Sequence, residues 1–172
     1  MTEDPGAQVR EALDAAGVEY EVMDCDPDLA DTAAFCAHYG VPVEQAANTI
    51  LVAGKPRGGG AKTYMACVVL AHTRLDVNGA VRRRLDVKKA SFASADETRD
   101  LTGMLIGGVT AAALPEGMAL WVDARVMDAP WVVLGGGDRS TKVKAAPSVL
   151  LALGAEVVDD LAVLAPPGPS GA

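Results

Sequence analysis

The sequence predicts a mixed α/β protein in which helices cover a β-sheet. Half of the 172 residues are apolar and 22% are charged, which is typical of a globular chain with a substantial core. Apolar residues recur at helical spacing in some segments and at strand spacing in others, and the two kinds of segment alternate along the chain. Capping residues, glycines and prolines separate these segments.

The first part of the chain predicts two helices with a strand between them. The Asp-Pro pair at residues 4–5 suits an N-cap and a first helical turn, and an apolar stripe then continues to Gly17. Residues 18–24, VEYEVMD, alternate between apolar and polar side chains as a half-exposed strand does. Asp31 or Thr32 is expected to cap the second helix, which ends at a Gly-Val-Pro sequence.

The middle of the chain predicts a β-hairpin. Residues 49–54 (TILVAG) and 63–70 (TYMACVVL) are expected to be buried strands, and the glycine-rich turn 55–62 joins them. A short basic helix is expected at residues 79–85, followed by a strand at 90–93.

The remaining elements begin with a capped helix. Ser94, with Glu97 three residues later, is a capping box, and the helix that it opens is expected to end near Gly103. The last expected elements are strands at 118–124 and 131–136, a helix at 144–153 and a strand at 155–159.

The chain shows no repeat and no internal linker, so residues 1–164 are predicted to form a single domain. Residues 165–172, APPGPSGA, are predicted to be a flexible tail. No apolar run approaches the ~18 residues that a membrane-spanning helix needs, and the acidic N-terminus does not resemble a signal peptide. We therefore expect a cytoplasmic protein without a membrane partner.

The cysteines and histidines predict neither a metal centre nor a thiol nucleophile. Cys25, Cys36 and Cys67 are an odd set without CxxC spacing, which argues against a disulfide framework and a zinc site. Cys36 and His38 are two residues apart in an expected helix, so they face different directions. We expect the cysteines to be packing or surface residues, and we expect no metal and no cofactor.

The net charge of −8 argues against a protein that binds nucleic acid by charge alone, because neutralised phosphates supply most of such affinity. DNA is therefore not an expected partner. The positive charge is nevertheless clustered in residues 82–89 and 139–144. The simplest interpretation of both clusters is a solvated surface.

Two glycine-rich segments stand out. Residues 102–117, TGMLIGGVTAAALPEG, hold Gly107 and Gly108 but no evident nucleophile, base or metal ligand, and residues 135–137 are three successive glycines. Glycine permits tight turns, and it also lets a ligand approach backbone N–H groups that bind an anion. Both interpretations stay open. Neither segment matches a P-loop or GxGxxG, so nucleotide phosphate binding is weakly supported.

Several longer segments occur in a definite order: AANTILVAG, YMACVVLAHTRLDV, KKASFASADET, LTGMLIGGVT, LWVDARV and WVVLGGGDRSTKVKAAPSVLL. From about Ala12 to Leu161, this order and spacing resemble the YbaK/prolyl-tRNA synthetase-associated family of aminoacyl-tRNA deacylases. The resemblance implies a curled mixed β-sheet surrounded by helices. It also implies hydrolysis of the ester between a wrong amino acid, small in size, and the tRNA for proline. The implied partners are the acceptor end of that tRNA and an aminoacyl-tRNA synthetase.

The resemblance also implies a set of site residues. The Lys-Thr pair of the family falls on Asn48 and Thr49, so a neutral amide replaces a positive charge. The implied catalytic residues are Asn48, Thr49, Gly107 and Gly108. The implied substrate-binding residues are Thr110, Gly135, Gly136, Gly137, Arg139 and Asp123. Two alternatives stay open, since Asn48 also suits a strand-end cap and Asp123 a turn cap.

A site without a catalytic side chain suits ester hydrolysis, because backbone amides stabilise a developing oxyanion. We therefore expect that a side chain at Gly108 blocks hydrolysis and leaves the fold intact. Three functions stay open at this point: a deacylase that acts in trans, a non-catalytic relative that binds a ligand or a synthetase, and a module that kept the fold without the pocket. A pocket shared by Asn48, Gly107 and Gly135 would argue against the last of these.

Overall fold

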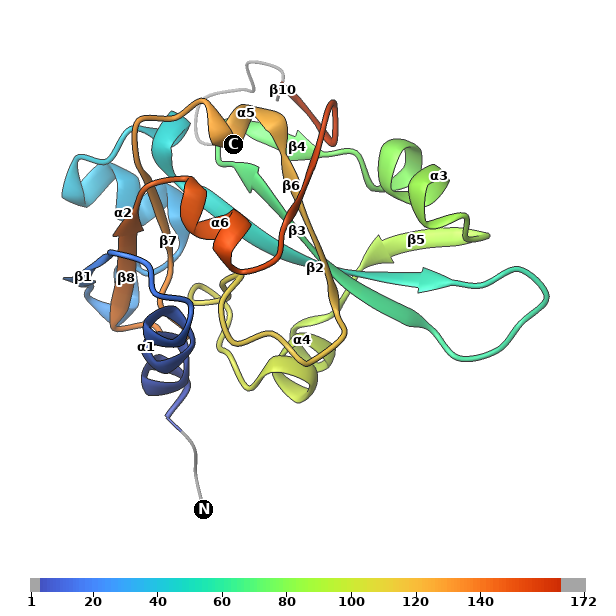
Figure 1. Cartoon of the computed structure of the whole chain (residues 1–172), viewed down its shortest axis with the longest axis horizontal. Coiled ribbons are helices and arrows are strands. Elements are labelled where there is room, and N and C mark those ends of the chain that lie inside the picture. The colour runs from blue at the N-terminus through green and yellow to red at the C-terminus, as the bar shows by residue number, and fades with distance from the viewer. Residues whose placement is uncertain (1–3, 165–172) are drawn as a thin grey trace.

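The computed structural model describes residues 4–164, which form a mixed α/β fold (Figure 1). Five strands form one sheet in the order β5-β2-β3-β6-β9, and three form a second sheet in the order β1-β8-β7. A bridge between Ala46 and Val133 links the two sheets beside the start of β2. Strands β4 and β10 pair separately. The predicted fold class, a mixed sheet with surrounding helices, is confirmed.

The elements have the following bounds. The strands are β1 (Glu21–Asp24), β2 (Ala47–Lys55), β3 (Thr63–Leu70), β4 (Thr73–Leu75), β5 (Lys89–Phe92), β6 (Ala119–Asp123), β7 (Val132–Gly135), β8 (Thr141–Ala145), β9 (Glu156–Val158) and β10 (Ala162–Leu164). The helices are α1 (Pro5–Ala15), α2 (Thr32–Tyr39), α3 (Arg82–Leu85), α4 (Ala95–Thr102), α5 (Ala124–Met127) and α6 (Ser148–Ala152). A π-helical turn, Val77–Val81, precedes α3.

The residues that were expected to cap helices are the N-caps of α1, α2 and α4. The Asp4 side chain accepts a hydrogen bond from the N–H of Gly6 at 3.0 Å and begins α1. Ser94 and Glu97 form both hydrogen bonds of the capping box at the start of α4. Asp31 is the N-cap of α2, but its side chain makes no capping hydrogen bond. The carboxylate of Asp31 is therefore available for other contacts.

Strands β2 and β3 form the expected hairpin, and it sets the position of the site. The two strands pair antiparallel from Ala47 opposite Leu70 to Gly54 opposite Thr63. β5 pairs with the far half of β2, and β6 runs parallel to β3. The turn of the hairpin projects from the body of the protein in Figure 1. The start of β2 lies at the other end, beside β7.

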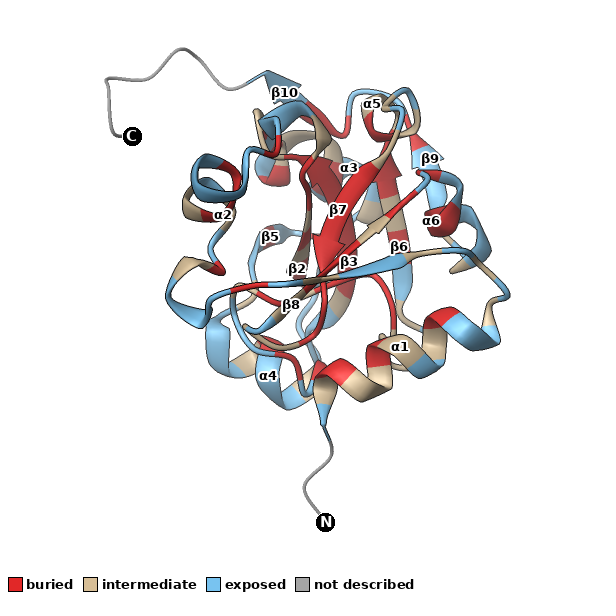
Figure 2. Ribbon diagram, turned by 90° about the vertical axis from the view of Figure 1, so that its left-hand side faces the viewer, coloured by how far each residue is buried: buried red, intermediate tan, exposed pale blue. Residues whose placement is uncertain are grey.

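Alternate side chains of β3 pack into two different apolar clusters. Ala66 and Val68 pack in a cluster with Leu13 of α1, whereas Met65 and Cys67 pack in a second cluster. Because both faces of the strand are covered, its sequence is a continuous apolar run. Figure 2 shows the buried residues concentrated along the central strands, with α1 and α4 exposing one side.

The structure differs from the prediction in its shorter elements. Strand β8 occupies residues where the predicted last helix begins, and α6 starts only at Ser148. The sequence TKVKA carries little apolar signal, and β8 is a strand because β1 and β7 pair with both of its edges. Strands β4 and β10 and helix α5 were also not predicted. The predicted flexible tail, residues 165–172, lies outside the described residues. No helix within residues 4–164 is long and apolar enough to cross a membrane.

Candidate active site

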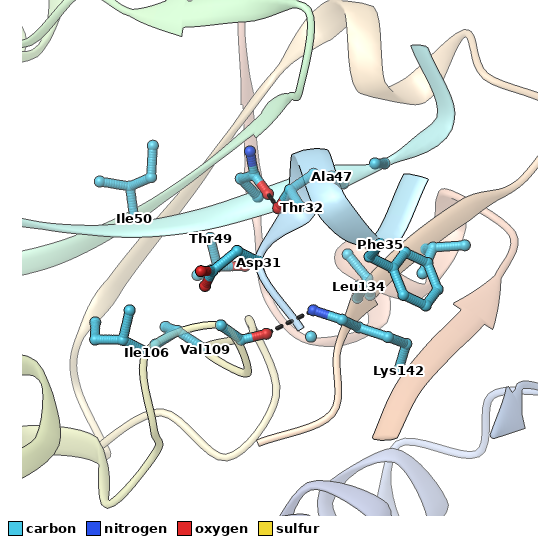
Figure 3. A pocket seen from close by; sticks show the side chains of 15 residues that line it. Asp31, Thr32, Phe35, Ala47, Thr49, Ile50, Ile106, Val109, Leu134 and Lys142 are labelled. Atoms are coloured by element: carbon cyan, nitrogen blue, oxygen red, sulfur yellow. Dashed lines mark hydrogen bonds between the residues drawn. The ribbon is translucent and has the colours of Figure 1, made fainter. Parts of the chain in front are cut away.

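A cavity of about 250 Å³ lies where the start of β2 meets β7, β8, α2 and the loop 105–110 (Figure 3). Asn48, Thr49, Gly107 and Gly135 all line it, so the structure brings these four predicted site residues together. A wider, shallower hollow around His72 contains none of the predicted site residues. The shared cavity argues against a module that kept the fold without a pocket.

The other predicted site residues do not line the cavity. They are Gly108, Thr110, Gly136, Gly137, Arg139 and Asp123. Most belong to the two loops that form its wall, and Asp123 lies elsewhere.

The two glycine loops bind each other through their backbones. Gly137 donates its N–H to the carbonyl of Gly108 at 2.6 Å, and its own carbonyl accepts from the N–H of Leu105 at 3.1 Å. A Cβ on Gly108 would lie 2.7 Å from the carbonyl carbon of Asp138, and one on Gly135 would lie 2.7 Å from that of Gly108. Glycine is therefore required because two main chains touch here.

This packing corrects the expectation for Gly108. A side chain at this position meets the Asp138 backbone, so it would disturb the fold rather than only block a substrate. The N–H of Gly108 already donates to the carbonyl of Leu105 at 2.8 Å, so it is not free for an oxyanion.

Arg139 connects three segments around the cavity. Its Nε and Nη2 donate to the carbonyl of Pro27 at 3.0 and 2.8 Å, and its Nη1 donates to the carbonyl of Ile106 at 2.7 Å. Nη1 also lies 3.2 Å from Oδ1 of Asp31. Because these contacts use four of its five N–H donors, Arg139 holds the walls of the cavity in place.

Asp123 is completely buried outside the cavity. Its Oδ1 accepts hydrogen bonds from the N–H groups of Leu161 and Ala162 at 3.1 and 3.3 Å, and its Oδ2 lies 3.2 Å from Arg125. We therefore remove Asp123 from the candidate substrate-binding residues. Its side chain also makes no capping hydrogen bond at the start of α5, so it is not the turn cap of the alternative interpretation either, but a buried link to the chain at the start of β10.

Asn48 and Thr49 present different groups to the cavity. The Oδ1 of Asn48 accepts a hydrogen bond from the Thr32 hydroxyl at 2.6 Å, which fixes the amide. The hydroxyl of Thr49 is buried and has no hydrogen-bond partner among residues 4–164. A buried polar group without a partner costs about 1–3 kcal/mol, so a bound ligand or water would relieve this cost.

Lys142 also lines the cavity, and the sequence analysis did not single it out. Its side chain is only 6% exposed, and its Nζ donates to the carbonyls of Ala30 at 2.6 Å and Gly107 at 2.5 Å. Nζ also lies 5.4 Å from the centre of the Phe35 ring. Burial lowers the pKa of this lysine. Lys142 belongs to the unpredicted strand β8, and its alternating TKVKA pattern does not show which face is buried.

The cysteines do not contribute a nucleophile to the cavity. All three are buried and free, and none lines the cavity, as expected for packing residues. Burial raises the pKa of the Cys67 thiol to about 12 and also raises the pKa values of Cys25 and Cys36. Within residues 4–164, no three His, Cys, Asp or Glu side chains gather as metal ligands would.

Comparisons with known proteins add two findings. Residues 26–153 match the model of a family described as "Aminoacyl-tRNA editing domain". Among solved structures, the chain is similar to a candidate trans-editing enzyme for prolyl-tRNA synthetase, with 25% identity and a TM-score of 0.77 over 92% of this chain and 98% of the other. It is also similar to the hypothetical protein APE2540, with 26% identity and a TM-score of 0.78 over 90% of this chain and 99% of the other.

Proposed function

The chain belongs to the aminoacyl-tRNA editing domain family and is an aminoacyl-tRNA deacylase, and we propose that it removes a small amino acid wrongly attached to the tRNA for proline. The reaction would take place in the cavity between β2, α2 and the loop 105–110. The choice of tRNA is supported by the similarity to a candidate trans-editing enzyme for prolyl-tRNA synthetase. The same similarity suggests a prolyl-tRNA synthetase as a second partner.

The unpaired hydroxyl of Thr49 at the cavity is the observation that carries this proposal. It is a buried polar group that lacks a partner in a cavity whose other walls include the apolar side chains of Phe35 and Ile106. Such a combination suits a ligand with one polar and one apolar end. The cavity volume of about 250 Å³ lies below the ~300–1,000 Å³ of typical sites for drug-sized ligands, which favours a small amino acid.

The chemistry needs little from the protein. Water attacks the carbonyl carbon of the ester, and negative charge develops on the carbonyl oxygen. Groups that are fixed before the reaction stabilise this charge without forming a covalent intermediate. The absence of a cysteine, serine or histidine nucleophile among the described cavity residues is compatible with this route.

The tRNA backbone needs positive charge, and the hairpin end of the sheet supplies it. Lys55 and Lys89 lie directly opposite each other in β2 and β5, and both line a small hollow. Like charges in this position repel each other. Lys62 also lines the hollow, but its Nζ lies 3.5 Å from the carboxylate of Glu97. The hollow and the cavity lie at opposite ends of β2, about 23 Å apart along the strand, so we assign to the hollow the backbone phosphates of the acceptor stem and not those beside the ester. Charge reversal at Lys89 should weaken tRNA binding and reduce its salt dependence.

Two further parts of the proposal concern the chain as a whole. Strand β10 pairs with β4, which supports one editing domain that includes the residues up to Leu164. The cytoplasm is the expected compartment because charged tRNA is used there.

A panel of mischarged tRNAs tests the proposed function. The tRNA for proline would be charged in turn with alanine, serine, cysteine and proline, and loss of each ester would be followed with and without the protein. We expect faster loss of at least one small amino acid and little effect on the proline ester. The Thr49→Val variant, which loses the unpaired hydroxyl but keeps the shape, should be slower. Loss of every ester at the uncatalysed rate would refute the proposal.

A further inference from the structure

The cavity holds a buried cation that has no anionic partner. None of the ion pairs within residues 4–164 includes Lys142. Its two hydrogen-bond acceptors, the carbonyls of Ala30 and Gly107, are neutral. A buried charge without a counter-charge is costly, and proteins normally pair it.

Lys142 has an N–H that these contacts do not use. An ammonium group has three donors, and the two carbonyls occupy two of them. Gly135 lies opposite Lys142 in the β7–β8 pairing, so no side chain from that position covers the lysine. The remaining donor belongs to a group that lines the cavity.

A carboxylate lines the same cavity. Asp31 stands at the start of α2, and its side chain is 70% exposed and makes no capping hydrogen bond. One of its oxygens, Oδ1, contacts Arg139, while Oδ2 has no partner among the described residues. Figure 3 shows Asp31 and Lys142 entering the cavity from different walls. The cavity therefore presents one negative and one positive group that do not pair with each other.

An aminoacyl ester carries the complementary pair of groups. Its α-ammonium is positive, and its carbonyl oxygen becomes negative when water attacks. We infer that Lys142 donates its third N–H to the ester carbonyl oxygen and that Asp31 binds the α-ammonium group. The inference rests on the deacylase function proposed above, and it adds the two side chains that orient the substrate.

The reaction balances with water as the only co-substrate. The water oxygen bonds to the carbonyl carbon, and the carbonyl π electrons move to the oxygen that faces Lys142. The tetrahedral species collapses by breaking the bond between carbon and the ribose oxygen. That ribose oxygen receives a proton that came from the water. The products are the free amino acid and the tRNA with its terminal hydroxyl restored.

The arrangement also accounts for the neutral residue at position 48. Lys142 comes from β8, a different strand from the one that carries Asn48, yet both residues line the same cavity. The cavity therefore has a positive group without a lysine at position 48, and the amide of Asn48 is held by Thr32.

The test of Lys142 uses Lys142→Met and a matched control. The control is Lys144→Met on the same strand, where Nζ lies 4.3 Å from the centre of the Trp131 ring and outside the cavity. Deacylation of the best substrate from the panel would be measured under steady-state conditions over a range of substrate concentrations. We expect Lys142→Met to lower kcat about a hundredfold or more with little change in KM, which is typical of losing an oxyanion donor. Lys144→Met should stay within about twofold of the wild type.

A structural role for Lys142 predicts different results. Lys142→Gln removes the charge but keeps N–H donors, so it can still donate a hydrogen bond to the carbonyl of Ala30 or Gly107. We expect it to fold like the wild type and to share the kcat defect. If Lys142→Gln restores the wild-type rate, or if Lys142→Met raises KM and leaves kcat unchanged, the assigned contact with the carbonyl oxygen is wrong.

The test of Asp31 uses the substrate's own amine. The same tRNA would carry either the free amino acid or its N-acetyl derivative, which lacks the positive charge. We expect wild type and the control Asp28→Asn to prefer the free amine at least tenfold, and Asp31→Asn to lose this preference. Equal rates for the two substrates with wild type would overturn the Asp31 assignment and leave the deacylase function standing. No hydrolysis of any substrate by wild type would instead refute the function itself.

Discussion

Replacing Gly108 with alanine should destabilise the protein because the added methyl group meets a main chain. The ideal Cβ would lie 2.7 Å from the carbonyl carbon of Asp138 and 2.8 Å from its nitrogen. No rotamer change relieves such a contact, so the loop 105–110 must separate from the glycines that follow β7. Overpacking of this kind costs about 1–3 kcal/mol.

The separation also breaks two hydrogen bonds, from Gly137 to Gly108 and from Leu105 to Gly137. Each contributes about 0.5–1.5 kcal/mol, which brings the expected loss in the free energy of unfolding to about 2–6 kcal/mol. Against the ~5–15 kcal/mol of a typical domain, this is a large fraction. Deacylation should fall with it, because Gly107 and Val109 of the same loop line the cavity.

Urea unfolding followed by circular dichroism measures the loss. The matched control is Gly103→Ala, at a glycine with a φ of +74° and open space around it, where about 1–2 kcal/mol is expected from the backbone alone. Because Gly108 does not have a positive φ, its cost comes from the contact with Asp138. A Gly108→Ala variant as stable as wild type would refute the close packing of the two loops.

Three further predictions concern other parts of the chain. Asn48→Lys should lower deacylation at both low and high salt. It removes the hydrogen bond with Thr32 and adds a second ammonium group to a cavity that already holds Lys142. A faster reaction at low salt would show instead that the site lacks positive charge. Hydrogen bonds from the Ser94 backbone and the Tyr64 hydroxyl lower the pKa of Glu97 to about 2, so its stabilising effect is present above pH 4.5 and is lost as the pH falls towards 2. The stability difference between wild type and Glu97→Gln should therefore shrink over that range in urea titrations, and a constant difference would contradict the lowered pKa. Burial raises the pKa of Cys67 to about 12, so this thiol should resist alkylation at pH 8 until the protein is unfolded. Mass spectrometry would measure the labelling. Rapid labelling of the native protein would mean that β3 separates from its neighbours.

The elements with strong local signals were predictable. The capping box at Ser94 and the Asp-Pro pair at residues 4–5 act through bonds between residues a few positions apart, so the sequence contains all of the interaction. The apolar runs of β2 and β3 predicted buried strands because they are shorter than a typical buried helix and a glycine-rich turn joins them. Strand β8 was missed because its own sequence carries little apolar signal. Its neighbour β7 is the preceding strand, but β1, which pairs with its other edge, comes from the far end of the chain.

The candidate site was only partly predictable. The resemblance to a deacylase family led to Asn48, Thr49, Gly107 and Gly135, and these residues do line one cavity. It also led to Asp123, which lies in a buried hydrogen-bond network elsewhere. Neither residue type nor spacing separates a carboxylate that caps backbone N–H groups from one that faces a ligand.

The sequence by itself determined the fold class, the hairpin, the capped helices and the family, since local pattern and segment order carry this information. Only the tertiary structure decided what the glycines do and where the positive charge of the site comes from. Two glycine loops distant in sequence touch through their backbones, and a lysine from an unpredicted strand reaches the cavity. Both features depend on which segments meet in space. The local spacing of apolar and polar residues predicts helices and strands, but it does not show which distant segments come into contact.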